Sequence, residues 1–135
     1  MRIQEDASAL YSPELFRTCI LPATRKIAQA FPYSLLHLHS SSLFLLEEFL
    51  SIKEIGVFQV NRDVGELGLP EMEPFLRTIQ QRGRRLYLRG SFTEQEYRWI
   101  RTHLSPIGLI VQGVVSSAEQ GKELLSLARS LWPSK

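Results

Sequence analysis

The sequence predicts an α/β fold made of four parallel βα units. Capping residues and helical spacing of apolar residues mark a helix after each of four short apolar runs. Strands that alternate with helices pair in parallel, because each helix returns the chain to the same end of the sheet. Four such units make half of a (β/α)8 barrel, and they also fit a small open sheet with helices on both faces. The expected strands are residues 33–39, 56–60, 85–89 and 108–112, in sequential order.

An extra helix is expected over residues 13–30, ahead of the first strand. Pro13 suits the first turn of a helix that starts after Ser12. Pro22 lies inside the pattern and should kink the helix, because proline lacks the N–H that the helix ladder needs. Apolar residues at helical spacing predict its buried face, namely Leu15, Phe16, Cys19, Ile20, Ala23, Ile27 and Ala30.

Later helices have their own start and stop signals. Thr93 and Glu96 have the spacing of a capping box, in which each side chain bonds the other residue's backbone N–H. Leu124, Leu125, Ala128 and Leu131 form the apolar stripe of the last helix. The other signals are Ser41 or Ser42 before a short helix at 43–51, Pro70 and Gly83 around the next helix, and Ser116 with Glu119 before the last one.

The composition is that of an ordinary globular domain. A length of 135 residues predicts one domain over residues 1–135, large enough to bury a core. The net charge is +2 with scattered basic residues, so no nucleic-acid partner is expected. The single cysteine excludes an internal disulfide and a Cys-rich zinc module. No apolar run approaches ~20 residues and the start lacks a signal-peptide core, so we expect no membrane partner and a cytoplasmic location.

Two histidines end the first expected strand. Side chains alternate along a strand, so Leu35, His37 and His39 share one face. The carboxyl ends of parallel strands are where α/β enzymes place their chemistry. Two imidazoles there can bind one metal, such as zinc, and Asp63 after the second strand is the nearest third ligand by topology. The alternative is a pair of histidines that are hydrogen-bonded at a barrel mouth.

Polar residues also end the other strands. Asn61 ends the second strand, Arg89 the third and Gln112 the fourth, which predicts a polar, substrate-binding rim. Arg89 suits an anionic small molecule, and a salt-bridged surface arginine is the alternative. The densest basic cluster is expected to be a solvated rim rather than a phosphate or carboxylate clamp, and it consists of Arg82, Arg84, Arg85 and Arg89.

Three segments together resemble the uroporphyrinogen decarboxylase superfamily. They are Tyr-Ser-Pro-Glu-Leu-Phe at 11–16, Ile-Leu-Pro at 20–22 and Leu-His-Leu-His at 36–39. The later Leu-Arg-Gly-Ser at 88–91 is similar to that family's strand ending in Gly-Asn. The resemblance covers essentially the whole chain. It implies the C-terminal half of a full (β/α)8 barrel, without the first strands.

The superfamily has two chemical branches. One removes carboxylates from porphyrinogen side chains without a cofactor, and the other moves methyl groups between corrinoids and thiols with zinc. The zinc branch has His-x-Cys on the strand that matches 33–39 and a later cysteine. Here His37 matches the histidine, His39 replaces the cysteine, and no cysteine lies near Gln112. The decarboxylase's late Gly-His-Gly is missing as well, while its acidic position before the first helix matches Glu5-Asp6, which suggests Asp6 as substrate-binding.

The resemblance therefore implies a uroporphyrinogen decarboxylase-like protein whose catalytic set is incomplete in this chain. The alternatives are a zinc-dependent corrinoid methyltransferase-related fragment and a non-catalytic half-barrel binding module. The isolated chain is expected to lack both activities and to bind zinc weakly or not at all. A half-barrel has two open strand edges, so a homo-oligomer or a missing barrel half is expected as partner. In the competing arrangement, the helix at 13–30 swings across the inner face of a monomer.

Overall fold

The computed structural model describes residues 1–63, 65 and 67–133. Its centre is a five-stranded sheet in the order β1-β2-β3-β4-β5, and every neighbouring pair is parallel. The strands are β1 (Arg2–Gln4), β2 (Ser34–His39), β3 (Ile55–Asn61), β4 (Arg85–Gly90) and β5 (Leu109–Gly113). The helices are α1 (Pro13–Leu15), α2 (Leu21–Gln29), α3 (Leu46–Leu50), α4 (Leu69–Gln81), α5 (Glu94–His103) and α6 (Ala118–Leu131).

The predicted α/β class and the four expected parallel strands are confirmed as β2 to β5. The sequence analysis missed β1, which pairs in parallel with β2 through Arg2↔Leu35 and Gln4↔His37. Three residues are too few to show a two-residue alternation. They become a strand because the open edge of β2 supplies partners for their backbone groups, for example Leu35 N–H, which donates to Met1 O at 2.8 Å.

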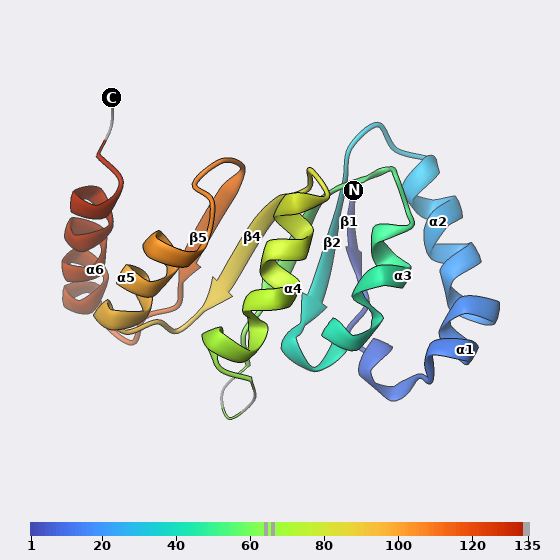
Figure 1. Cartoon of the computed structure of the whole chain (residues 1–135), viewed down its shortest axis with the longest axis horizontal. Helices are drawn as coiled ribbons and strands as arrows, with labels where there is room; N and C mark the ends of the chain where they lie inside the picture. Colours follow the sequence, from blue (N-terminus) through green and yellow to red (C-terminus); the bar gives the residue numbers. More distant parts are fainter. Residues whose placement is uncertain (64, 66, 134–135) are drawn as a thin grey trace.

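One face of the sheet is covered by helices and the other is open. Sequential strand order combined with right-handed crossovers places every connecting helix on the same side. Figure 1 shows α3 and α4 lying across the strands in this way. The strand residues that point to the helices are almost all fully buried, and they include Leu36, Leu38, Phe58, Val60, Leu86 and Leu88. The arrangement is that of a half-barrel, and not of a sheet with helices on both faces.

The segment at 13–30 does not cross the inner face. Phe16 packs edge-on against Phe49 of α3 at 4.7 Å between ring centroids, so this segment lies with the other helices. Its predicted buried face is correct at Phe16 and wrong at most other positions: Cys19 is exposed, and the other buried residues are Leu21, Thr24 and Ala28. A π-helical turn at Phe16–Ile20 inserts an extra residue before Pro22, and this rotates the following helix face.

Most helix signals hold, with two corrections. Thr93 and Glu96 form the predicted capping box. The last helix is capped by Ser117, whose Oγ accepts from Gln120 N–H, and not by Ser116 with Glu119. The segment before α3 is a 3-10 helix at Ser40–Leu45, and Ser42 Oγ accepts a buried hydrogen bond from Ser8 Oγ at 2.8 Å instead of capping. Within the described residues, no helix has the length and apolarity that a bilayer crossing requires.

Candidate functional site

Polar side chains form two adjacent rows across the open face of the sheet. Strand register aligns His37 with Gln59 and Tyr87, and the next row aligns His39 with Asn61 and Arg89. Gln112 of β5 extends the second row. The expected shared face of His37 and His39 is therefore confirmed by the register, and it is the face without helices. The rows arise because side chains alternate along each strand, so that the residues between the polar ones point to the helices.

Each histidine is oriented by a hydrogen bond from one ring nitrogen. Nδ1 of His37 lies 2.9 Å from Gln59 Oε1, and Nδ1 of His39 lies 2.8 Å from Asp63 Oδ2. A carbonyl oxygen and a carboxylate oxygen only accept, so the hydrogen-bonded Nδ1 of each ring carries the proton. The Nε2 lone pairs of neutral rings are then available to a ligand.

Both Nε2 atoms meet one carboxylate. Asp6 Oδ1 lies 3.8 Å from His37 Nε2 and 3.5 Å from His39 Nε2. Asp6 follows β1, so the parallel pairing of β1 with β2 carries it to the end of the histidine strand. Two nitrogen lone pairs and a carboxylate oxygen repel one another unless a proton or a metal cation lies among them.

The cluster has the geometry of an incompletely closed metal site. The three ligand atoms of Asp6, His37 and His39 all lie within 4.8 Å of one another. Ligand atoms on one zinc ion are roughly 3–3.5 Å apart, given bonds of about 2.0–2.2 Å, so small side-chain rotations close the set. Imidazole nitrogen and carboxylate oxygen suit zinc, and metal-binding histidines almost always donate their second ring N–H to an acceptor. These residues therefore fit a zinc ion.

The contacts of Asp63 and Asp6 bear on the roles expected from the sequence. Asp63, expected as a third metal ligand, has a carboxylate that accepts from His39 Nδ1. Asp6, expected to bind substrate, is the residue whose carboxylate lies beside both histidines, in a group that could hold a metal ion. Asp6 lies beside the Nε2 atoms because β1 pairs with β2. The four strands expected from the sequence do not include this pairing.

Burial favours the neutral, metal-binding form of His37. The side chain lies in the sheet with 6% of its surface exposed. Burial lowers the pKa of His37 below its ordinary value, and electrostatic interactions with Arg2 and His39 lower it further. The hydrogen bond to Gln59 and the charge of Asp6 act in the opposite direction but are smaller than the burial effect.

A chain of hydrogen bonds joins the histidine cluster to the rest of the predicted rim. Arg89 donates to Asn61 Oδ1 at 2.6 Å, and Asn61 Nδ2 donates to Asp63 Oδ1 at 2.6 Å. Arg89 forms no ion pair among the described residues, so it is not the salt-bridged surface arginine of the alternative interpretation. The structure thus brings Asn61 and Arg89 into one network with His39.

Gln112 lies at the far end of the face, where its Oε1 accepts from the Tyr87 hydroxyl at 2.7 Å. The sequence analysis missed Tyr87 and Gln59 as members of the polar face. The period of two in β3, where Gln59 and Asn61 alternate with Phe58 and Val60, is the signal that identifies Gln59. Two arginines of the basic cluster contact other residues of the protein. Arg82 donates to the Glu47 carboxylate and Arg84 donates to the Lys53 carbonyl, which agrees with a rim position and not with a ligand clamp.

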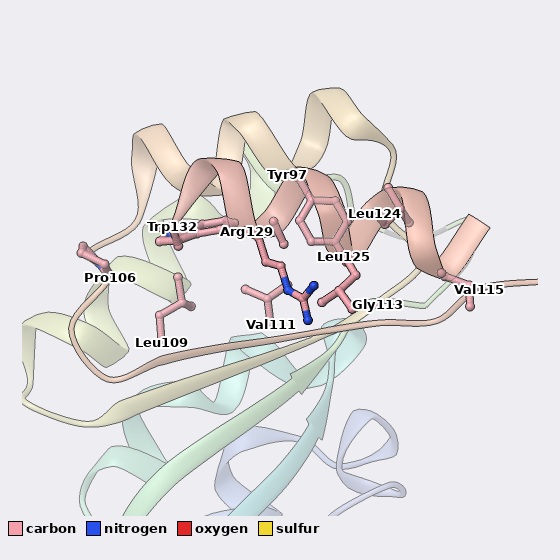
Figure 2. A pocket seen from close by; sticks show the side chains of 12 residues that line it. Tyr97, Pro106, Leu109, Val111, Gly113, Val115, Leu124, Leu125, Arg129 and Trp132 are labelled. Carbon is pink, nitrogen blue, oxygen red and sulfur yellow. The ribbon is translucent and has the colours of Figure 1, made fainter. Parts of the chain in front are cut away.

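A separate hollow of about 510 Å³ lies on the helix-covered side, between β5, α5 and α6. Figure 2 shows Val111, Leu124 and Tyr97 around it, with the guanidinium of Arg129 projecting between α6 and β5. Of the expected α6 stripe only Leu124 is buried, and Leu125 is 52% exposed. The hollow is mainly apolar and faces away from the polar rows, so the chemistry-bearing residues are elsewhere.

Fold and site together define a half-barrel of parallel βα units with a His-His-Asp cluster at the carboxyl ends of its strands. No protein-family model, curated protein or solved structure matches this chain.

Proposed function

We propose that this chain is the metal-binding part of a β/α-barrel enzyme of the uroporphyrinogen decarboxylase superfamily, with zinc bound by Asp6, His37 and His39. The observation that carries the proposal is the proximity of both Nε2 atoms to Asp6 Oδ1, at 3.8 and 3.5 Å. The Nδ1 atoms are held by Gln59 and Asp63, which leaves the Nε2 lone pairs available to a ligand.

Within that superfamily, the cluster favours the zinc-dependent, methyl-transferring branch. The resemblance places His37 at the zinc-binding histidine of that branch. An imidazole at His39 in place of a thiolate keeps a zinc ligand, and Asp6 supplies the third. A zinc ion with three protein ligands retains an open position, where it acts as a Lewis acid and lowers the pKa of a bound thiol or water.

The protein's own residues would prepare that site in three ways. Gln59 and Asp63 fix the ring orientation and the tautomer of the two histidines. The burial of His37 keeps its ring neutral at neutral pH. Asn61 holds Asp63 through its amide, so that the carboxylate that orients His39 is itself fixed.

The second candidate is a decarboxylase-like protein that works without a metal. Arg89 favours it, because a half-buried arginine without a carboxylate partner among the described residues suits a carboxylate substrate. In that case Asp6 and the two histidines hold and move a proton. In either case we propose that the sheet is completed by a second copy or another barrel half, in the cytoplasm.

Isothermal titration of zinc into chelator-treated protein tests the proposal. We expect one zinc per chain, and at least about tenfold weaker binding in Asp6→Ala, His37→Ala and His39→Ala. Asp63→Ala should weaken binding by roughly 10–100-fold, because it orients a ligand. His103→Ala is the matched control, because His103 stacks on Trp99 of α5 away from the cluster. Equal zinc affinity in wild type and His39→Ala would refute the metal site.

The sequence analysis predicts weak or absent zinc binding by the isolated chain. Because the structure places the Asp6 carboxylate beside the two histidines, we propose that the chain binds zinc measurably.

A further inference from the structure

Three side-chain amide oxygens on the open face each already accept one hydrogen bond. Gln59 Oε1 accepts from His37, Asn61 Oδ1 accepts from Arg89, and Gln112 Oε1 accepts from Tyr87. Both oxygens of Asp63 are occupied as well, by His39 and Asn61. A ligand on this part of the face therefore meets acceptor oxygens that are already hydrogen-bonded within the protein.

The same bonds leave donors on three neighbouring strands. No interaction among the described residues uses the amide nitrogen of Gln59 on β3 or of Gln112 on β5. Arg89 on β4 uses one guanidinium nitrogen, on Asn61. Among the described residues, Arg84 Nε is the single buried side-chain nitrogen or oxygen without a partner. The amide nitrogen of Gln59 therefore reaches the surface, although the residue is only 5% exposed.

We infer that this donor surface, formed by Gln59, Arg89 and Gln112, binds a carboxylate-bearing ligand beside the histidine cluster. A carboxylate only accepts hydrogen bonds, and its planar pair of oxygens matches the guanidinium fork. Arg89 forms no ion pair with an acidic side chain among the described residues, so its guanidinium can pair with a carboxylate of a ligand.

The position of the surface relative to the cluster sets the ligand's size. His39, Asn61 and Arg89 are register partners on successive strands, so the backbones at His39 and Arg89 are two strand spacings, or roughly 10 Å, apart. A short dicarboxylate can engage Arg89 with one end and extend toward the cluster with the other. The contact between the second carboxylate of the ligand and a zinc ion rests on the proposed function, whereas the contact between the first carboxylate and Arg89 does not.

Binding of glutarate to chelator-treated protein tests the donor surface without metal. We expect saturable binding by calorimetry, about tenfold or more weaker in Arg89→Gln and partly restored in Arg89→Lys, as befits a charged hydrogen bond. Arg98→Gln is the matched control, since Arg98 is an exposed arginine on α5, and it should bind glutarate like wild type. Circular dichroism melting establishes that each variant is folded.

A zinc-loaded sample separates this inference from the proposed function. We expect zinc to tighten glutarate binding in wild type and not in His39→Ala, while Arg89→Gln still binds zinc. If zinc does not bind but glutarate binding still depends on Arg89, the proposed metal site fails and the donor surface stands. Undetectable glutarate binding by folded wild type, equal binding in Arg89→Gln, or tighter binding of inorganic phosphate than of glutarate overturns the inference.

Discussion

Asp6 Oδ1 lies 3.5 Å from Nε2 of His39, although the two residues belong to different strand ends. The contact exists because β1 and β2 run in parallel, with Gln4 opposite His37, so the residues that follow both strands emerge at the same edge. The Glu5 N–H donates to the His37 carbonyl at 3.3 Å, which continues the pairing just beyond β1 and fixes the backbone next to Asp6. The three-residue strand is thus what brings the Asp6 carboxylate to the histidine pair.

Acidification is expected to destabilise the metal-free protein through His37. Burial lowers the pKa of His37 from its ordinary 6.5, so the unfolded chain takes up this proton before the folded chain does. Stability is therefore fully present above about pH 6.5 and falls as the pH drops toward the folded pKa. The groups that influence the pKa of this ring are Gln59, through its hydrogen bond, and Arg2, His39 and Asp6.

Urea unfolding between about pH 7.5 and 5.5 measures this effect, and His37→Gln should show a smaller loss than wild type. Burial raises the pKa of Glu5, which has the opposite sign, because its contribution to stability falls as the pH rises above 4.5. Glu5 is present in both proteins, so it cancels in the difference between them. Identical pH profiles for wild type and His37→Gln would contradict the prediction.

Gly113 is expected to be intolerant of a side chain. A Cβ at this position, the end of β5, would lie far inside van der Waals contact with the hydroxyl oxygen of Tyr97. Tyr97 is buried and its ring packs edge-on against Phe92 at 5.8 Å, which limits how far it can move. We expect Gly113→Ala to lower the free energy of unfolding by roughly 1–3 kcal/mol.

A double-mutant cycle checks the cause of that loss. In a Tyr97→Phe background the clashing oxygen is gone, so Gly113→Ala should cost clearly less there. Gly56→Ala is the control, because a Cβ at Gly56 meets nothing within 4 Å. The steric explanation is wrong if denaturant unfolding gives the same penalty for Gly113→Ala in both backgrounds.

The open edge at β5 is expected to support association. Ile110 is 47% exposed on the open face of this edge strand, and Val114 and Val115 just after it are each 39% exposed. An unpaired strand edge flanked by apolar side chains favours pairing with another chain. Light scattering at micromolar concentration should therefore give a mass above the 15.5 kDa of one chain.

Ile110→Lys should shift that mass toward the monomer, because it places a charge in the contact. Ile27→Lys, at a position 46% exposed on α2, should leave the mass unchanged. Wild-type protein that stays monomeric across the concentration range would exclude self-association.

Local patterns in the sequence were sufficient for much of the fold. Apolar runs predicted β2 to β5, and the Thr93–Glu96 spacing predicted the start of α5. Strand parity placed His37 and His39 on one face. These features depend on residues close in the chain, where backbone geometry fixes which side chains are neighbours.

Contacts between distant segments were decided by the tertiary structure. β1 has no recognisable pattern of its own and exists as a strand because β2 offers an edge. Asp6 reaches the histidines only through that pairing, and Gln59 and Asp63 orient them only because β3 lies beside β2. The sequence by itself therefore determined β2 to β5, most of the helix starts and the shared face of the histidine pair. The place of Asp6 beside the histidines and the hydrogen bonds that orient the rings depend on strand register, which joins residues too far apart in the chain for local periodicity to relate them.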